Sequence, residues 1–505
     1  MQAAAYRART CLYDDRTGKT HDYRRAGAET GKFIASGILL PENAPAWLTD
    51  ETLSEQRRRA VLWNAVETKE TRKDAVLARD MLISLPRELS HDENIELVTA
   101  FLQEQCVARG MVADWAFHEE PAGDGGLNPH VHVMLTMRPF DLEAEDGWGK
   151  KAHRGLPKSV DQPVPNGPDW NSRAQLMAWR EEWAVYANRA LAARGYDIRI
   201  DHRSYEEQGI DAKPGFPIGK TAAALEREGE ETSAAERLAE IKRENAERIT
   251  EDPAIVIAKV ARQRATFTQT DIARTLHELI APYGQHFGRG DGDDDAVAFN
   301  ALLARVMAEP ALTSLGKDQN GAERFATRQQ IVMEEAIERM AYDLNGRNAH
   351  AVSWPLPGGR LSAQQKLAAQ HILDGGDITC LIGKAGSGKT TTLNAVSRTL
   401  EAEGYRVRGS ALSGIAAQNL AEGAGIESQT VAALRALWAK GEHQLKGGDV
   451  LIVDEAGMLG TRDMYALIDA THQAGAKIVL DSAQRRALTR KLDKGLGRER
   501  GRDLE

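Results

Sequence analysis

Three histidines are spaced so that they could hold one divalent ion. His130 and His132 stand two residues apart in NPHVHVMLTM, a segment typical of a β-strand, so both imidazoles would lie on one face and the intervening valines on the other. His118 ends the alternating segment ADWAFH, and the Gly- and Pro-rich stretch 119–129 can turn the chain back as an antiparallel hairpin. Three neutral imidazoles would leave positions on the ion for water and substrate oxygens, which predicts a catalytic metal site.

Alternatives remain open at this point. A His-x-His pair alone is more often incidental than ligating, and a zinc hydrolase would use similar ligands. A tyrosine would indicate DNA chemistry, because a phenol oxygen beside a metal-held phosphate can attack phosphorus and store the bond energy in a phosphotyrosine ester. The segment 3–25 offers Tyr6, Tyr13 and Tyr23. Tyr6 lies in an Ala-rich stretch typical of a helix that could present one side chain to a cleft, although such a tyrosine is more often a packing residue.

A second set of residues predicts a phosphate-binding loop. GKAGSGKT at 383–390 matches the pattern G-x-x-x-x-G-K-[ST], follows the apolar segment ITCLI and precedes a helix-forming sequence. Its glycines would let backbone N–H groups wrap the β-phosphate, its lysine would reach the β- and γ-phosphates, and its threonine would ligate Mg²⁺. VLIVDEA would add one carboxylate for Mg²⁺ and another to polarise the attacking water. In chain order the residues are Gly383, Gly386, Gly388, Lys389, Thr390, Asp454 and Glu455.

The elements that must position these residues change along the chain. Up to about residue 215, alternating apolar segments such as 80–85 mix with helical stretches such as 173–194, which predicts an α+β domain. From about residue 355, short apolar segments alternate with helices, which predicts an α/β domain with a parallel sheet.

The middle of the chain predicts helices. Residues 220–262 are rich in Ala, Glu, Lys and Arg, which favours one long, solvated helix. Residues 263–350 continue the helical pattern around the acidic stretch 288–297. This stretch lacks the spacing and the closing Glu of a calcium-binding EF-hand loop, so we expect a solvated loop. Its candidate calcium ligands would be Asp291, Asp293, Asp294 and Asp295.

The composition excludes some classes of protein. The 505 residues carry 65 Lys and Arg against 74 Asp and Glu, a net charge of 65 − 74 = −9, which excludes a simple basic nucleic-acid coat but not a local DNA-binding patch. The three cysteines lie far apart and form no disulfide framework, as expected in a reducing compartment. With no apolar run of about 18 residues and no signal peptide, we expect a cytoplasmic protein without membrane insertion.

The N-terminal segment resembles the MobA/MobL family of plasmid conjugative relaxases, in particular its TraA-type relaxase–helicases. The resemblance covers nearly all of residues 2–215, and the family's HUH motif matches His130 to His132. It implies an HUH relaxase domain, an antiparallel sheet with helices, that nicks one strand of origin-of-transfer DNA through a 5′-phosphotyrosine. The matching segments are AAYRA with LYDDRTGKTHDY, LWNAVE, RKDAVLARDMLISLPRELS, NPHVHVMLTMR and RIDHRSYEEQGID.

The resemblance also implies roles. Tyr6 would be the nucleophile, with Tyr13 as the alternative, and the three histidines would hold Mg²⁺ or Mn²⁺. Asp80 would contact a ligating histidine without binding the metal itself and so orient its ring. The partners would be single-stranded origin-of-transfer DNA, accessory relaxosome proteins and a coupling protein.

Residues 361–484 resemble the first RecA-like domain of a RecD-type superfamily 1 helicase. LSAQQ matches the adenine-reading motif, with Gln365 as the contact, and GSALSGIAAQNLAE resembles the motif Ia region that touches single-stranded DNA. Asp481 and Gln484 keep a trace of the next motif before a basic tail. Against the family, the sequence lacks the first strand before AAYRA and the second RecA-like domain, so we expect truncation at both ends, ATP binding with Mg²⁺ and no unwinding.

The predicted protein is therefore a DNA relaxase joined to an incomplete ATP-binding helicase domain. The first alternative is a non-catalytic, truncated remnant that binds DNA or ATP. The second is a rolling-circle replication initiator, which shares HUH chemistry, although LWNAVE and RIDHRSYEEQGID favour mobilisation. The predicted divisions are 1–215, the HUH relaxase; 216–262, a charged helical linker; 263–355, a helical region; 356–484, the first RecA-like P-loop domain; and 485–505, a basic tail.

Overall fold

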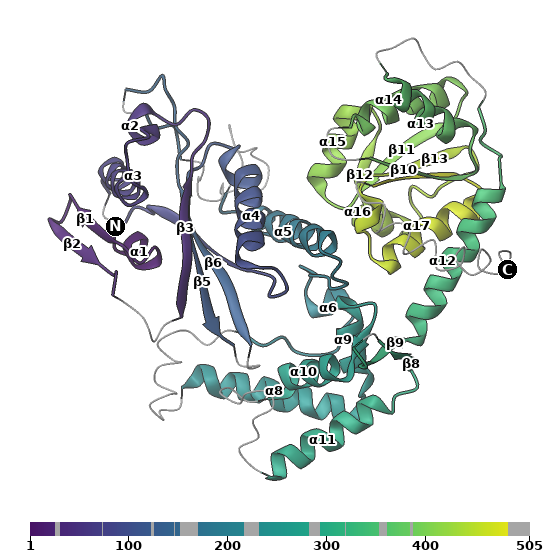
Figure 1. The fold of residues 1–505 in the computed structure, drawn as a ribbon, viewed down its shortest axis with the longest axis horizontal. Coiled ribbons are helices and arrows are strands. Elements are labelled where there is room, and N and C mark those ends of the chain that lie inside the picture. Colours follow the sequence, from purple (N-terminus) through teal and green to yellow (C-terminus); the bar gives the residue numbers. More distant parts are fainter. Residues whose placement is uncertain are drawn as a thin grey trace.

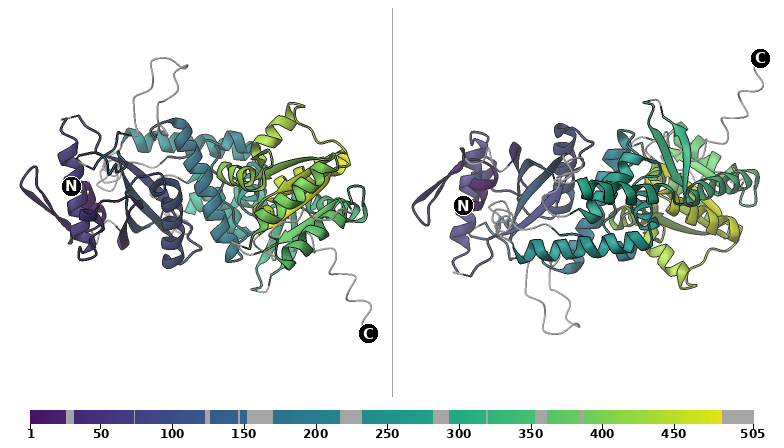
Figure 2. Two further views of the ribbon diagram at one scale, coloured as in Figure 1. Left: turned by 90° about the horizontal axis from the view of Figure 1, so that it is seen from above. Right: turned by 90° about the horizontal axis from the view of Figure 1, so that it is seen from below.

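An antiparallel sheet lies towards one end of the molecule and a parallel sheet towards the other, with a mainly helical region between them (Figures 1 and 2). Within the described ranges, no helix is long and apolar enough to cross a membrane. The computed structural model describes residues 1–25, 31–72, 74–122, 126–145, 147–151, 170–216, 232–281, 293–318, 320–352, 361–383 and 387–482.

The antiparallel sheet has the strand order β3–β5–β6–β4. The predicted hairpin is confirmed, because His118 pairs with His130 and Ala116 pairs with His132 across its two strands. Cross-strand partners share a face, so the three histidines lie together on one side of the sheet, here called the site face. The strands are β3 (Lys32–Leu39), β4 (Ala78–Ser84), β5 (Ala113–Pro121) and β6 (Leu127–Thr136).

Helices cover both faces of this sheet (Figure 1). The opposite face carries the buried Trp115, Phe117, Val131 and Val133, which pack into one core with residues of α4 and α5. A second core gathers α1, α3 and the β1–β2 hairpin on the site face. The bounds are α1 (Gln2–Arg7), β1 (Cys11–Asp14), β2 (Lys19–Asp22), α2 (Ala46–Thr49), α3 (Glu55–Lys69), α4 (His91–Leu102), η1 (Gln103–Val107), α5 (Arg173–Ala193) and α6 (Tyr205–Gln208).

The prediction of one long, solvated helix over 220–262 is wrong in the described part, 232–262. The helix α8 (Ser233–Glu251) ends before Pro253, and α9 (Ala254–Gln263) follows as a separate helix. Proline lacks the N–H that would continue α8 and disfavours a helical conformation at the residue before it. The apolar run Ile255–Ile257 is buried in a core shared with α10 and α11. Lys, Glu and Arg elsewhere in the segment conceal this short apolar run when composition alone is considered.

The region 263–350 is not wholly helical. It contains an antiparallel sheet of order β7–β9–β8, formed by β7 (Phe267–Thr268), β8 (Leu312–Lys317) and β9 (Glu323–Thr327). The sequence prediction missed these strands because they are short. Of the acidic stretch, Asp291 lies outside the described residues, and the following acidic run begins α11 rather than a loop. The helices are α10 (Gln269–Ile280), α11 (Asp293–Met307) and α12 (Arg328–Gly346).

The predicted parallel sheet is confirmed, with the order β10–β14–β13–β11–β12. Its central strands are almost wholly buried, as expected for a sheet with helices on both faces. The carboxyl ends of β10, β14 and β13 lie side by side and carry the phosphate-binding motifs. The elements are α13 (Ala363–Asp374), β10 (Ile378–Ile382), α14 (Lys389–Ala402), β11 (Arg406–Ala411), α15 (Gly414–Ala424), β12 (Ser428–Thr430), α16 (Val431–Ala439), β13 (Asp449–Val453), η2 (Ala456–Met458), α17 (Thr461–Ala474) and β14 (Lys477–Ser482).

The predicted domain boundaries stay predictions. Gln484 and the basic tail 485–505 lie outside the described residues, as do residues 217–231 of the predicted linker.

Candidate functional site

The helix α1 is fixed across the site face by its last residue. The carbonyl oxygen of Arg7 lies 2.7 Å from Nε2 of His118. Nη2 of Arg7 donates a hydrogen bond of 2.5 Å to Oδ2 of Asp80 on β4. Ala4 and Ala5 form the buried side of this helix. These contacts tie the end of α1, the helix that carries Tyr6, to two strands of the sheet.

His118, His130 and His132 form one group, here called the histidine cluster. Their ring centroids lie 5.3–5.9 Å apart, so all three contact one another. Nδ1 of His130 lies 2.9 Å from the carbonyl oxygen of Asn128. A carbonyl oxygen can only accept, so the proton of His130 is on Nδ1 and its lone pair is on Nε2. A hydrogen bond of this kind fixes the tautomer of a metal-binding histidine.

The same reasoning gives a different result for His118. Its Nε2 faces the carbonyl oxygen of Arg7, so Nε2 carries the proton and the lone pair is on Nδ1. Across the described ranges, no three His, Cys, Asp or Glu residues are arranged so that they could hold a metal ion. The histidine cluster has residues of a metal-binding type in mutual contact, but their arrangement in the structure is not one that could hold an ion. Ligation through Nε2 would require His118 to leave the carbonyl oxygen of Arg7. Metal ligation stays a prediction.

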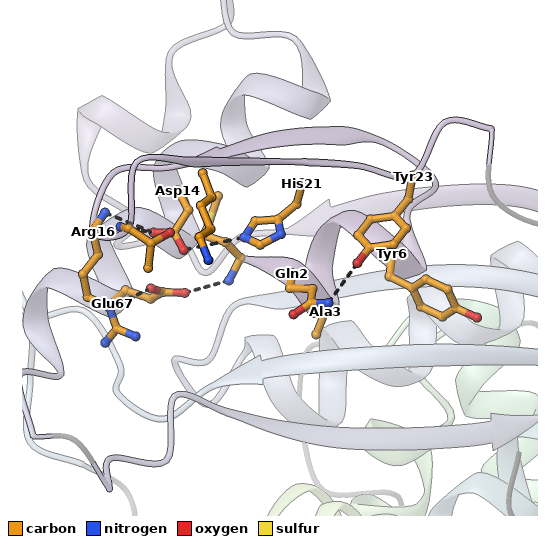
Figure 3. Close-up of a pocket in the computed structure, with 11 residues that line it drawn as sticks. Gln2, Ala3, Tyr6, Asp14, Arg16, His21, Tyr23 and Glu67 are labelled. Carbon is orange, nitrogen blue, oxygen red and sulfur yellow. Dashed lines mark hydrogen bonds and ion pairs between the residues drawn. The ribbon is translucent and has the colours of Figure 1, made fainter. Parts of the chain in front are cut away.

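Tyr6 lies in an aromatic and cationic setting. Its ring meets Tyr23 edge-on, with centroids 5.4 Å apart, and the guanidinium carbon of Arg9 lies 5.0 Å from its centroid. Tyr6 and Tyr23 line one end of a cavity of about 770 Å³ (Figure 3). Asp14 and Glu67 lie at the other end. An arginine cation is attracted to the electron-rich face of an aromatic ring. Arg9 therefore also adds positive charge beside Tyr6, which would attract a phosphate.

The structure separates the two predicted tyrosines. Tyr13 lies on β1, and its side chain is 53 % exposed on the β1–β2 hairpin. Tyr6, by contrast, is the residue before Arg7, whose carbonyl contacts the histidine cluster. This arrangement favours Tyr6 over Tyr13 as the residue close to the cluster.

Asp80 lies on the site face but not beside a histidine in its strand register. Its cross-strand partner is Met134, while Leu82 is the partner of His132. Its carboxylate instead pairs with Arg7. Asp80 thus anchors α1 in this arrangement, and the predicted role of orienting a ligating histidine stays untested.

The phosphate-binding loop joins β10 to α14 as predicted. Gly388 has φ +77°, and a Cβ on it would lie 2.2 Å from Nε2 of Gln365. Both the left-handed backbone and the close approach therefore require glycine. Nε2 of Gln365 donates to the carbonyls of Ser387 and Gly388 at 3.3 Å, while its Oε1 accepts from the N–H of Ser362. Gln365 is thus brought to the loop, and Gly386 lies outside the described residues.

The carboxylates of this site lie beside Lys389. Nζ of Lys389 is 3.9 Å from Oδ1 of Asp481, at the end of β14. Burial, together with the neighbouring charge of Asp454 and against the lowering effect of Lys389, raises the pKa of Asp481 to about 8. Burial and the charge of Glu455 also raise the pKa of Asp454, which is hydrogen-bonded to Asp481. Two buried carboxyl groups that share a proton make a site that favours a cation.

Comparison with known proteins gives the identity of both regions. The MobA/MobL family model matches residues 1–228, and the AAA domain model matches residues 360–491. Residues 1–228 are a MobA/MobL-family domain. Residues 360–491 are an AAA domain, and its loop at Gly388 is the phosphate-binding loop described above.

The chain is similar to several proteins named for conjugal transfer or mobilization. The chain is 34 % identical to the conjugal transfer protein TraA of Agrobacterium fabrum over 507 residues, which cover 95 % of this chain and 44 % of TraA. A probable conjugal transfer protein TraA of Sinorhizobium fredii is also 34 % identical, with the same coverage. A probable mobilization protein MobA of Bifidobacterium longum is 28 % identical over 64 % of this chain and 60 % of its own length. The chain thus spans less than half the length of the TraA proteins.

Sequence reasoning missed several residues of the two sites. Arg7 and Arg9 of the MobA/MobL domain follow Tyr6 in the chain, and only their closeness in sequence to Tyr6 could have drawn attention to them. Arg189, on α5 of the same domain, contacts Glu455 of the AAA domain at 2.5 Å. The two residues are 266 positions apart, so no local pattern could have joined them.

Proposed function

We propose that this chain is a conjugative relaxase that nicks one strand of origin-of-transfer DNA and also binds ATP with Mg²⁺. The observation that carries the proposal is the contact of the Arg7 carbonyl with His118, which ties the helix that carries Tyr6 to the histidine cluster. The family of residues 1–228 supports DNA processing in plasmid transfer. Plasmid DNA lies in the cytoplasm, which is therefore the proposed site of action.

The reaction that fits these residues is a transesterification. The phenol oxygen of Tyr6 forms a bond to the scissile phosphorus while the bond to the 3′ oxygen breaks. The phenol proton passes, in the net reaction, to the departing 3′ oxygen, and the 5′ end remains attached to the protein. The guanidinium of Arg9 lies over the Tyr6 ring and supplies positive charge where the DNA phosphate approaches.

The histidine cluster is the proposed holder of Mg²⁺ or Mn²⁺. When bound, the ion would supply positive charge to a non-bridging phosphate oxygen. The contact with Asn128 holds the proton of His130 on Nδ1, so the lone pair on Nε2 is available to bind the ion. His118 would exchange its contact with Arg7 for the ion, so metal binding and the position of α1 are expected to be linked.

The proposed partners follow from the same family. They are single-stranded origin-of-transfer DNA, accessory relaxosome proteins and a coupling protein. The relatives named for conjugal transfer favour this function over replication initiation. DNA affinity should fall steeply with salt, because phosphate contacts release counterions.

The test is covalent attachment to DNA. The chain is mixed with labelled single-stranded origin-of-transfer DNA and Mg²⁺ or Mn²⁺ and then run on a denaturing protein gel. We expect a labelled protein band that EDTA and Tyr6→Phe both eliminate. Tyr13→Phe is the matched control, because Tyr13 is an exposed tyrosine of the neighbouring hairpin, and it should keep the band.

Other outcomes contradict the proposal. A band that survives Tyr6→Phe would remove Tyr6 from its role. No band with any metal would favour the non-catalytic remnant. A band with the replication origin of the same plasmid, but not with its transfer origin, would favour a rolling-circle initiator.

A further inference from the structure

The helix α5 of the MobA/MobL domain also contacts the AAA domain. Glu182, Tyr186 and Arg189 are spaced at i, i+4 and i+7, so they lie along one side of the helix. Other residues of α5, including Trp179, pack into the core against the antiparallel sheet β3–β5–β6–β4. Figure 1 shows α5 on the side of the antiparallel sheet that faces the AAA domain. The helix therefore connects the DNA-processing domain with the nucleotide-binding one.

One contact of α5 reaches the residue predicted to activate water. Nη2 of Arg189 donates a 2.5 Å hydrogen bond to Oε1 of Glu455. The other carboxylate oxygen of Glu455, Oε2, is buried and has no hydrogen-bond partner among the described residues. A buried carboxylate oxygen without a partner is costly unless another donor, such as water, fills the place. Arg189 thus fixes one oxygen of Glu455 and leaves the other to accept from a ligand.

The backbone at Glu455 adds to this observation. Glu455 has φ +53°, a left-handed conformation that a residue with a side chain rarely adopts. Its N–H donates to Oδ1 of Asp454 at 2.8 Å, which ties it to the proposed magnesium ligand. Such a conformation persists where the surroundings hold it, and it is common at functional sites. The hydrogen bond from Arg189 is one of the contacts that hold the side chain of Glu455.

Arg189 is itself held in place. Its guanidinium carbon lies 5.6 Å from the centroid of the Tyr186 ring, and the Tyr186 hydroxyl donates to Glu104 of η1. One turn earlier on α5, Glu182 is buried and accepts hydrogen bonds from the backbone of Ile415 and the hydroxyl of Ser413. Burial raises the pKa of Glu182. These contacts fix α5 against the start of α15 and so fix the reach of Arg189.

We infer that Arg189 is a positioning residue for ATP hydrolysis, supplied to the AAA domain by the DNA-processing domain. It holds Glu455 so that Oε2 accepts a hydrogen bond from the attacking water. In the reaction, the water oxygen bonds to the γ-phosphorus, the bond between this phosphorus and the β–γ bridging oxygen breaks, and ADP leaves. The water proton passes to Glu455. The inference rests on the proposed ATP site and deepens it by making ATP turnover depend on α5.

The experiment measures steady-state ATP hydrolysis by the full chain, with and without single-stranded DNA, and binding of a fluorescent ATP analogue. Arg189→Ala should lower kcat about 10- to 100-fold, the scale of loss when a reacting group is misplaced, and should leave KM and nucleotide affinity unchanged. Arg189→Lys should restore part of the loss, since it keeps the charge but not the planar fork. The matched control is Arg194→Ala, because Arg194 ends the same helix and pairs with Glu93 at a similar distance of 2.5 Å.

The outcomes separate the inference from the proposed function. A wild-type chain that does not bind the ATP analogue would overturn the proposed nucleotide site itself. A chain that binds ATP without hydrolysing it, with DNA or without, would overturn the positioning role alone. An unchanged or increased kcat in Arg189→Ala would also overturn it, as would a loss of affinity and kcat together that Arg189→Lys does not restore.

Discussion

The two sites of this molecule are built in opposite ways. The phosphate-binding site forms where adjacent parallel strands end, and its loop residues are contiguous in sequence from Gly383 to Thr390. The proposed DNA-processing site lies on the face of an antiparallel sheet, and its proposed nucleophile, Tyr6, belongs to the separate helix α1, which packs on that face. The first site therefore depends mainly on local backbone, whereas the second depends on a tertiary contact between Arg7 and His118.

The sites also differ in charge. The histidine cluster consists of imidazoles, two of which face backbone carbonyl oxygens. The nucleotide site holds the carboxyl groups of Asp454 and Asp481, whose pKa values are raised by burial and by neighbouring carboxylate charge. A metal would thus meet neutral ligands in one site and must displace a shared proton in the other. This difference means that a change in one site should leave the chemistry of the other intact.

The largest expected effect comes from removing a cluster histidine. His130→Ala should lower the rate of covalent attachment by about 1,000-fold, since a metal ion contributes several kcal/mol to the transition state. Nucleotide affinity should not change. Attachment is measured under single-turnover conditions on the denaturing gel. His91→Ala is the control, because His91 pairs with Glu119 outside the cluster. Equal rates for His130→Ala and the wild type would contradict the proposed metal role.

The converse change is in the phosphate-binding loop. Lys389→Ala should weaken ATP binding about 100-fold, because charge-assisted hydrogen bonds to the β- and γ-phosphates are lost. DNA attachment should stay as in the wild type. Binding is followed with a fluorescent ATP analogue, and Lys440→Ala, an exposed lysine that caps α16, is the control. If Lys389→Ala also stopped DNA attachment, the two sites would not be independent.

A smaller effect is expected at the anchor of α1. Asp80→Ala should slow attachment by about two- to fivefold, since the Asp80 carboxylate is 58 % exposed and such pairs contribute up to about 1 kcal/mol. Arg7→Ala should have a similar effect through the same pair, and the double variant should be no slower than either single variant. Additive losses in the double variant would show that the two residues act separately.

The smallest effect concerns stability. Burial lowers the pKa of Lys477, on β14, from 10.5 to about 8. Between these values the folded protein binds fewer protons than the unfolded chain, so the stability of the wild type should rise with pH from about 8 to about 10.5. Lys477→Met should therefore stabilise this lobe at pH 7, by on the order of 1 kcal/mol, and less at higher pH.

The measurement for Lys477 is the midpoint of the thermal transition that ADP shifts upwards, since a ligand stabilises the part of the chain that binds it. The midpoint difference between Lys477→Met and the wild type should shrink as the pH rises from 7 to 10. A difference that is the same at both pH values would show that the charge of Lys477 is not the cause.

The sequence was sufficient where chemistry and local pattern coincide. Alternation and a Gly- and Pro-rich turn predicted the hairpin that pairs His118 with His130, and one motif predicted the phosphate-binding loop. It was insufficient where a contact spans the chain. Arg7 meets His118 across 111 positions and Arg189 meets Glu455 across 266, and no periodicity carries such information. Composition also concealed the buried α9, whose apolar run lies beside highly charged residues.

The central claim, that Tyr6 carries the DNA, is tested most directly by locating the modified residue. After reaction with origin-of-transfer DNA, the adduct is digested with nuclease and trypsin and analysed by mass spectrometry. Cleavage after arginine places Tyr6 in the peptide 1–7 and Tyr13 in the peptide 10–16, so the two nucleophiles are distinguished by mass. The account predicts a nucleotide mass on Tyr6 within the peptide 1–7. The same mass on the peptide 10–16, with an unmodified peptide 1–7, would contradict it.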